Sequence, residues 1–219
     1  MTEALKPRAG FGILPSNGYK INTHISYEHN NFISGLNLSD SGTLLEEFSS
    51  NHTGKIEVKG TYNLEIPKTK GLMLSTHTDI GYLINTEVDS FFHFFGGGLP
   101  GLKGFPFYSI EGSRKIVETI SLRFPVLKNY NIPIGIFTFQ NSSLGFIYSV
   151  GDAWRKNSEI SWKQSAGAEL RINGFSFYNF PTAIGLELHH GLDTFQRQIN
   201  NKSVTYGQEQ RFYLTILFG

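Results

Sequence analysis

Short segments in which apolar and polar side chains alternate recur along this chain, and no other feature restricts its fold as strongly. In 54–66 the apolar residues share one face with Gly60, while lysine, glutamate, threonine and asparagine share the other. Such alternation with period two is typical of a β-strand with one apolar and one polar face. The sequence predicts about eight such strands, over 18–28, 54–66, 71–83, 113–126, 144–154, 162–173, 180–190 and 210–219. We therefore expect an all-β, antiparallel fold that occupies residues 1–219 as one region.

The segments between these strands are expected to be polar loops at 29–53, with room for some ordered structure of its own, and at 191–209, and irregular at 127–143. Strands of about ten residues span a bilayer when they are tilted. Outer-membrane barrels have short periplasmic turns and longer external loops. Most of the predicted loop lengths fit that rule. The exception is the pair 127–143 and 155–161, because 155–161 is the expected external loop and is the shorter of the two. A soluble β-sandwich also alternates, so the sequence alone does not decide which face meets the surroundings.

The stretch 96–112, with the sequence GGGLPGLKGFPFYSIEG, has too many glycines for a helix and is longer than a hairpin needs. Long loops in compact proteins are usually functional or disordered. Disorder is disfavoured because the stretch contains Leu102, Phe105, Phe107, Tyr108 and Ile110. We expect the loop over about 84–112 to fold back into the inside of a β-barrel, with Lys103 as the charged residue that tethers it there.

Composition removes several classes of function. The net charge is +1, which does not indicate nucleic acid or another polyanionic partner. The chain has no cysteine, which excludes disulfides, thiolate metal sites and a cysteine nucleophile. No apolar run approaches the length of a membrane-spanning helix. The first residues, MTEALKPRAG, do not read as a signal peptide, so an exported protein would need an N-terminal part that this chain lacks.

Histidines and hydroxyls offer two candidate chemical sites. His24, His77 and His189 fall on polar faces, but no HExxH motif or tight ligand spacing accompanies them, so ordinary hydrogen bonding is favoured over metal binding. No metal or other cofactor is predicted. Ser75, His77 and Asp79 alternate on one face, as a lipid-acting hydrolase would need at a barrel rim. Neighbours of this kind point parallel rather than toward one another, so we predict no enzyme activity.

Glycine and phenylalanine clusters are best interpreted as structural. Gly96, Gly97, Gly98 and Gly101 could bind phosphate, but no helix follows to supply an N-terminal dipole. A turn that lets the backbone pass close to a barrel wall is the preferred interpretation. The phenylalanines of 91–95 and 175–180 are expected to be interfacial aromatics or packing for the loop.

Five motifs between residue 71 and the end occur in the order found in one known family. They are Leu102-Lys103-Gly104-Phe105, Arg123-Phe124-Pro125, Gly151-Asp152-Ala153-Trp154, Gly167-Ala168-Glu169-Leu170-Arg171, and a terminal strand with Phe212, Leu214, Ile216 and Phe218. Together they resemble the Omp85 superfamily, whose C-terminal bacterial surface antigen barrel has sixteen strands. The chain is most similar to the barrels that follow Tol-type β-propeller regions. The first motif resembles the Arg-Gly-aromatic core of the family's inward-folded loop, and the last resembles its terminal assembly signal.

The resemblance implies specific contacts and also shows departures. Lys103 replaces the loop arginine, so a bidentate planar contact becomes a point-charge contact. Glu169 stands where the family often has glycine. We expect Lys103 to pair inside the barrel with Glu169 or Glu187, and Arg171 to face the same lumen.

The function implied by the resemblance is insertion or passage of polypeptides at the bacterial outer membrane, without chemistry. The expected partners are the lipid bilayer and polypeptide substrates. By this alignment the chain holds the last eight strands of a larger barrel. It could close alone, pair with another chain or be a fragment, and the fragment is preferred because eight strands leave little interior room for a loop. The alternative function is that of a soluble β-barrel that binds a small apolar ligand.

Overall fold

The computed structural model describes residues 2–6, 17–40, 42–69, 71–85, 88, 90–177, 179–199 and 202–218. Its strands are β1 (Thr2–Lys6), β2 (Asn17–Leu38), β3 (Leu44–Glu65), β4 (Met73–Leu83), β5 (Phe94–Phe95), β6 (Glu111–Gly112), β7 (Arg114–Leu127), β8 (Ile132–Ile134), β9 (Phe137–Trp154), β10 (Lys163–Ser176), β11 (Phe180–Gly191), β12 (Phe195–Ile199), β13 (Lys202–Tyr206) and β14 (Gln210–Phe218). Two short 3-10 turns, η1 (Ser90–Phe92) and η2 (Phe107–Ser109), lie between β4 and β7. The predicted all-β, antiparallel fold is confirmed.

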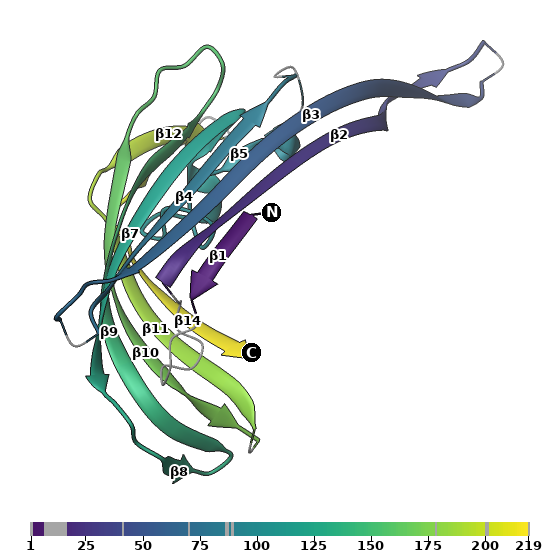
Figure 1. Cartoon of the computed structure of the whole chain (residues 1–219). Coiled ribbons are helices and arrows are strands. Elements are labelled where there is room, and N and C mark those ends of the chain that lie inside the picture. The colour runs from purple at the N-terminus through teal and green to yellow at the C-terminus, as the bar shows by residue number, and fades with distance from the viewer. Residues whose placement is uncertain are drawn as a thin grey trace.

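One curved sheet contains ten of the described strands, in the order β1-β2-β3-β4-β7-β9-β10-β11-β14, with β8 paired to β9. Each long strand pairs with the next long strand along the chain, so the sheet is a meander (Figure 1). Within the described residues β1 and β14 are not paired with each other, so the sheet is an open trough rather than a closed barrel. Closure into a barrel therefore stays a prediction.

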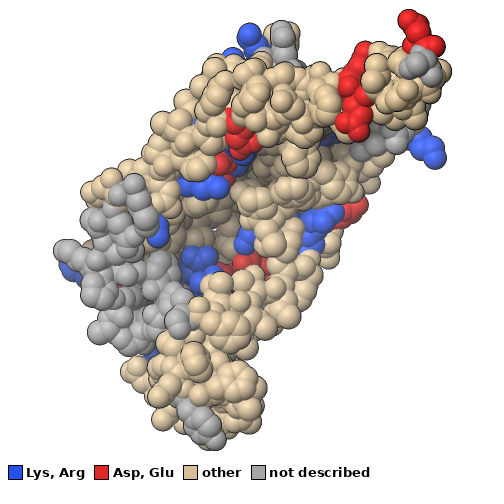
Figure 2. Space-filling model, turned by 90° about the vertical axis from the view of Figure 1, so that its right-hand side faces the viewer, with Lys and Arg blue, Asp and Glu red and all other residues tan. Residues whose placement is uncertain are grey.

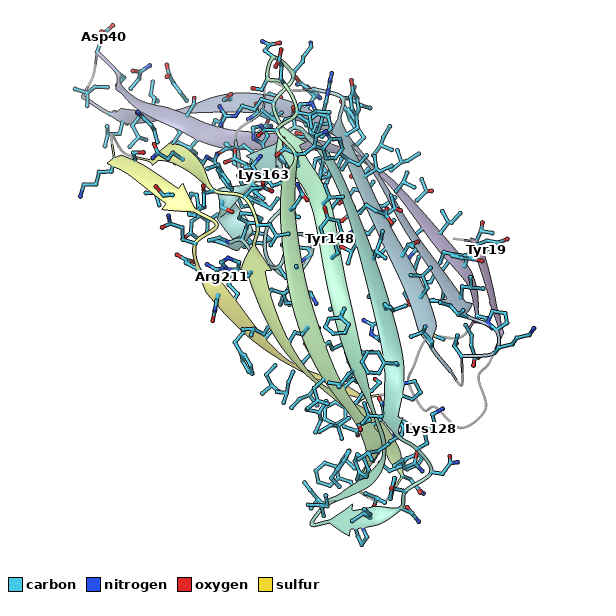
Figure 3. All side chains as sticks on the ribbon, turned by 90° about the vertical axis from the view of Figure 1, so that its left-hand side faces the viewer. Tyr19, Asp40, Lys128, Tyr148, Lys163 and Arg211 are labelled. Carbon is cyan, nitrogen blue, oxygen red and sulfur yellow. The ribbon has the colours of Figure 1, made fainter. Side chains whose placement is uncertain are left out.

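The two faces of the sheet differ in polarity. Large apolar side chains are exposed along the convex face, on which Tyr148 is labelled in Figure 3. They include Ile80, Ile120, Leu144, Phe146, Leu188, Phe212, Leu214 and Ile216. The concave face carries charged and hydroxyl side chains that are buried, among them Asp79, Lys115, Ser149, Glu169, Glu187 and His189. Figure 2 looks into this face and shows lysine, arginine and acidic residues gathered in its hollow.

The concave face is covered by the segment between β4 and β7, which we call the inner loop (residues 84–113). Residues 86, 87 and 89 of the predicted loop lie outside the described part. Leu102, Phe105 and Ile110 of the inner loop form an apolar cluster with Val117 of β7, Ala153 of β9 and Tyr206 of β13. The β12–β13 hairpin packs against the same cluster through Phe195 and Val204. The inner loop is therefore held between the sheet and this hairpin.

The prediction of loops at 29–53 and 191–209 is wrong, although the ordered structure allowed for 29–53 is present. Residues 29–38 and 44–53 continue β2 and β3 as a ribbon that extends past the end of β4, and 195–199 and 202–206 form the paired strands β12 and β13. The segment 127–143, expected to be irregular, contains β8 and the first residues of β9. The ribbon has no core-facing side and the two hairpin strands have only five residues each, so neither gives a sustained alternation.

None of the helical segments in the described ranges has the length and hydropathy that a membrane-spanning helix requires. Residues 7–16 of the N-terminal segment, for which no signal peptide is predicted, lie outside the described residues, as does Gly219 at the end of the predicted last strand.

Candidate functional site: the inner loop on the concave face

Lys103 anchors the tip of the inner loop to β11 and β14, the last two strands in the order of the sheet. Its Nζ forms an ion pair with Glu187 of β11, whose side chain is 6% exposed. The hydroxyl of Tyr213 on β14 donates a hydrogen bond to the backbone carbonyl of Lys103 at 2.9 Å. Glu187 also contacts His189 at 2.8 Å. Of the two carboxylates expected for Lys103, Glu187 is therefore the one that it contacts.

Gly104 brings the backbone of the loop against the backbone of the sheet. A Cβ at this position would lie 2.6 Å from the backbone nitrogen of Gly191 and 2.6 Å from the carbonyl carbon of His190. Gly112 is equally close to the wall, because its Cβ would lie 2.2 Å from the nitrogen of Trp154. Backbone atoms cannot yield as a flexible side chain can, so only glycine fits at these two contacts.

The glycine run forms a turn, and Gly96 lies near the wall, because a Cβ there would be 3.6 Å from the nitrogen of Ala153 on β9, but the closest contacts of the run are within the loop. A Cβ on Gly97 would lie 2.1 Å from the carbonyl oxygen of Pro106, and one on Gly101 would lie 2.1 Å from that of Gly96. These glycines let the inner loop fold tightly on itself, with Leu102 N donating to Gly96 O at 2.8 Å.

Leu102 and Phe105, which flank the Lys103-Gly104 anchor, are both completely buried. The ring of Phe105 lies 5.7 Å from that of Phe195 on the β12–β13 hairpin. Burying a large apolar side chain contributes about 1.5–3 kcal/mol. The four residues of the predicted loop motif thus divide their tasks: two fill the apolar cluster, one supplies the ion pair and one allows close backbone contact.

Glu111 joins three parts of the molecule. It accepts hydrogen bonds from Arg197 of the β12–β13 hairpin and, at 2.8 Å, contacts His93 of the inner loop. Arg155, which follows β9, lies 3.5 Å away. Burial would raise the pKa of Glu111, but the hydrogen bonds to His93 and Arg197 outweigh it and lower the pKa below its ordinary value of 4.5. Arg197 also donates to the carbonyl of Tyr108 at 2.9 Å.

Further ion pairs line the wall below the loop. Glu169, only 1% exposed, accepts hydrogen bonds from Arg123 of β7 and from Nε of Arg171 at 2.9 Å. The structure thus places Glu169 and Arg171 against each other and not against Lys103. Lys115 donates to Asp79 at 2.7 Å. Ionised groups can be buried in this way because each is paired with an opposite charge.

A cavity of about 340 Å³ lies between the tip of the inner loop and the wall. Most of its lining residues have polar side chains, among them Thr61, His77, Lys103, Thr119, Arg123 and Ser149, while Leu99, Pro100 and Ile147 add apolar surface. The hydroxyls and the paired cations can hold water or a polar group.

The candidate chemical sites are not assembled. Asp79 is engaged by Lys115, and His77 lies 3.1 Å from the Thr61 hydroxyl, so Ser75, His77 and Asp79 do not form a relay. His24, His77 and His189 lie on β2, β4 and β11, well separated in the sheet. Among the described residues no three His, Cys, Asp or Glu side chains are grouped to hold a metal.

The terminal-strand residues Phe212, Leu214, Ile216 and Phe218 are exposed on β14. Within the described residues β14 pairs only with β11, so its other edge is open.

Sequence reasoning did not find Glu111, Arg197 or His93. Arg197 lies in a segment interpreted as a polar loop, and its partner is 86 residues away. The one available signal was Glu111 itself, an acidic residue that closes an otherwise apolar stretch.

No family model, curated protein or solved structure matches this chain.

Proposed function

We propose that this chain is a membrane-embedded part of an Omp85-like barrel at the bacterial outer membrane, where it inserts or passes polypeptides without chemistry. One observation carries the proposal: the sheet is polar on its covered concave face and apolar on its uncovered convex face. A water-soluble fold places these faces the other way round.

The convex face supports lipid contact. Phe146 is 60% exposed, Phe212 68% and Leu214 62%. Monomeric soluble proteins rarely expose contiguous apolar patches larger than a few hundred Å². Lipid is the partner that covers such a face over several neighbouring strands, and strands can cross a bilayer when their sheet is closed, because a closed sheet satisfies its own backbone hydrogen bonds.

The concave face supports an aqueous interior. Besides its ion pairs it carries buried polar atoms without a protein partner in the described part of the chain, among them Ser75 Oγ, Ser165 Oγ and His189 Nδ1. Buried polar groups are nearly always satisfied by protein or by ordered water. An interior filled with water meets that requirement.

The inner loop and the edge of β14 support the polypeptide-handling role. The loop occupies the trough and is tethered by Lys103, in the position that the resemblance implies. Open strand edges are not tolerated in lipid, so β1 and β14 require partners. We assign these partners to the rest of a larger barrel.

The alternative, a soluble barrel that binds a small apolar ligand, is less well supported. Ligand pockets for apolar molecules are lined mainly by hydrophobic and aromatic side chains. Here the covered face presents Asp79, Lys115 and Glu169, all at most 5% exposed.

Membrane partitioning of the expressed chain, combined with gel mobility before and after boiling, tests the proposal. We expect a species that needs detergent and whose mobility shifts on boiling. Aggregation in the absence of detergent, with recovery of a folded β-sheet in micelles, would also agree with a piece of a larger barrel. A monomer that is soluble without detergent would overturn the membrane proposal in favour of the ligand-binding one.

A matched pair of substitutions sharpens that test. In water, Phe146→Arg at an exposed position should change stability by less than about 0.5 kcal/mol. In a bilayer, arginine on the lipid face costs about 2–4 kcal/mol near the midplane. Ile160→Arg is the control, because Ile160 is also exposed but lies in the turn between β9 and β10. Equal refolding of both variants into vesicles would contradict lipid contact at Phe146.

A further inference from the structure

Two histidines and a tyrosine converge where the β2–β3 ribbon leaves the sheet. His29 and His52 are direct register partners on β2 and β3, and Tyr27 precedes His29 on the same face. The row lies just past the end of β4, so the ribbon has lost its third strand there (Figure 1). Asn85 donates to the carbonyl of His52 at 2.9 Å and fixes the backbone at this point.

The distances bring three donor atoms to one place. Nδ1 of His29 lies 3.2 Å from Nδ1 of His52, and Oη of Tyr27 lies 2.6 Å from the same His52 nitrogen. The two imidazole rings are 4.3 Å apart at their centroids. All three side chains are exposed, so an ion from solution can reach them.

The hydrogen bond between the Tyr27 hydroxyl and His52 Nδ1 does not account for His29 Nδ1, which lies 3.2 Å from the same His52 nitrogen. A ring nitrogen of histidine carries either one hydrogen or one lone pair. His52 Nδ1 therefore makes only one full hydrogen bond, although two polar atoms stand within reach of it. A cation between the three atoms accepts a lone pair from each.

We propose that His29 and His52 bind a first-row divalent transition metal ion of the zinc, copper or nickel class, with the Tyr27 oxygen as third donor. Imidazole suits these metals. Zinc–nitrogen bonds of about 2.0–2.1 Å in tetrahedral geometry place two ligand nitrogens about 3.4 Å apart, close to the 3.2 Å observed. Tyr27 is 70% exposed and can swing outward by the fraction of an ångström that ligation needs.

The bound ion clips the two strands together at the base of the ribbon. Beyond this row the ribbon has only its own two strands, and a two-stranded hairpin is marginally stable in water. Metal binding should therefore slow hydrogen exchange of the backbone amides in 30–50, which a mere hydrogen-bonded cluster would not do.

Calorimetric titration of the full chain in detergent micelles with zinc chloride tests the site. We expect one ion per chain, with affinity reduced about tenfold or more in His29→Gln and in His52→Gln, and reduced less in Tyr27→Phe. His24→Gln is the control, because His24 is an exposed histidine of the same strand that lies outside the cluster, and it should bind as the wild type does. The proposal would be overturned if the wild-type chain did not bind zinc, or if the His29→Gln and His52→Gln variants bound zinc as tightly as the wild type. Unchanged hydrogen exchange of 30–50 with zinc bound would overturn the role of the ion as a clip.

Discussion

Replacing Lys103 with alanine should increase the fraction of molecules in which the inner loop is undocked from the sheet, without unfolding the sheet. The change removes the ion pair with Glu187. It keeps the hydrogen bond from Tyr213, which goes to the backbone carbonyl of residue 103, and it keeps the buried side chains of Leu102 and Phe105. The loop therefore retains its place on the concave face but loses its charged tether.

The size of the effect follows from the burial of the pair. Breaking a fully buried ion pair costs about 3–5 kcal/mol, because it leaves one charge unpaired. The Lys103 side chain is 23% exposed and Glu187 keeps His189 as a partner, which lowers the cost. A hydrogen bond to a charged group contributes about 1.5–3 kcal/mol, so we take about 2 kcal/mol. Since about 1.4 kcal/mol is a factor of ten, the open loop becomes about 30-fold more populated.

Proteolysis measures this population when opening and closing are fast relative to cleavage. Chymotrypsin is suitable because it cuts after aromatic residues, which the loop offers at Phe107 and Tyr108, and because trypsin would lose its site in the variant. Lys156→Ala, in the exposed turn after β9, is the matched control and should be cut like the wild type. A Lys103→Ala protein whose loop is cleaved at the wild-type rate would refute the reasoning.

Three further predictions concern the same loop. Gly104→Ala should expose the loop to chymotrypsin more than Lys103→Ala does, because its Cβ meets backbone at 2.6 Å, whereas Gly60→Ala, with its nearest neighbour at 3.9 Å, should be silent. Phe105→Ala should lower the free energy of unfolding by about 3–5 kcal/mol in a denaturant titration, since the ring is fully buried; a loss below 1 kcal/mol would mean that the loop is not packed. The lowered pKa of Glu111 stabilises the closed loop above pH 4.5, and this contribution should be lost as pH falls through the folded-state pKa. Protection of the inner loop, measured at a series of pH values, should decrease as this contribution is lost. The Glu111→Gln variant should not show this pH dependence.

The strands that could be predicted are those with two different faces. In 54–66 every second residue meets the convex side, so the alternation is complete, and the prediction ends within one residue of the C-terminal end of β3 although it omits residues 44–53. The ribbon beyond Gly54 leaves apolar side chains such as Phe32, Leu36 and Phe48 exposed among its polar residues, and the β12–β13 hairpin buries only part of one face, through Phe195, Val204 and Tyr206. Their strand structure comes from pairing between neighbours, which leaves no period in the sequence.

The site was predictable in part for a similar reason. The glycines and aromatics of 96–112 indicate a packed loop, and charge indicates Lys103 as its tether. Which carboxylate receives it depends on strand register: Glu169 and Glu187 are direct partners on β10 and β11, and two arginines already occupy Glu169. The bridge from Arg197 to Glu111 joins β12 of the hairpin to β6 of the inner loop, and no local pattern encodes such a pair.

The meander order of the sheet has a consequence for how the chain folds. Each long strand finds its partner in the next one along the chain, so the sheet can grow by successive addition of hairpins, which avoids the entropy of closing long loops. The inner loop follows another rule, because Lys103 must wait for Glu187, 84 residues later, and for Tyr213, 110 residues later. We therefore expect the trough to form first as an unplugged intermediate, with docking of the loop as the last and slowest event, delayed until β14 has joined the sheet.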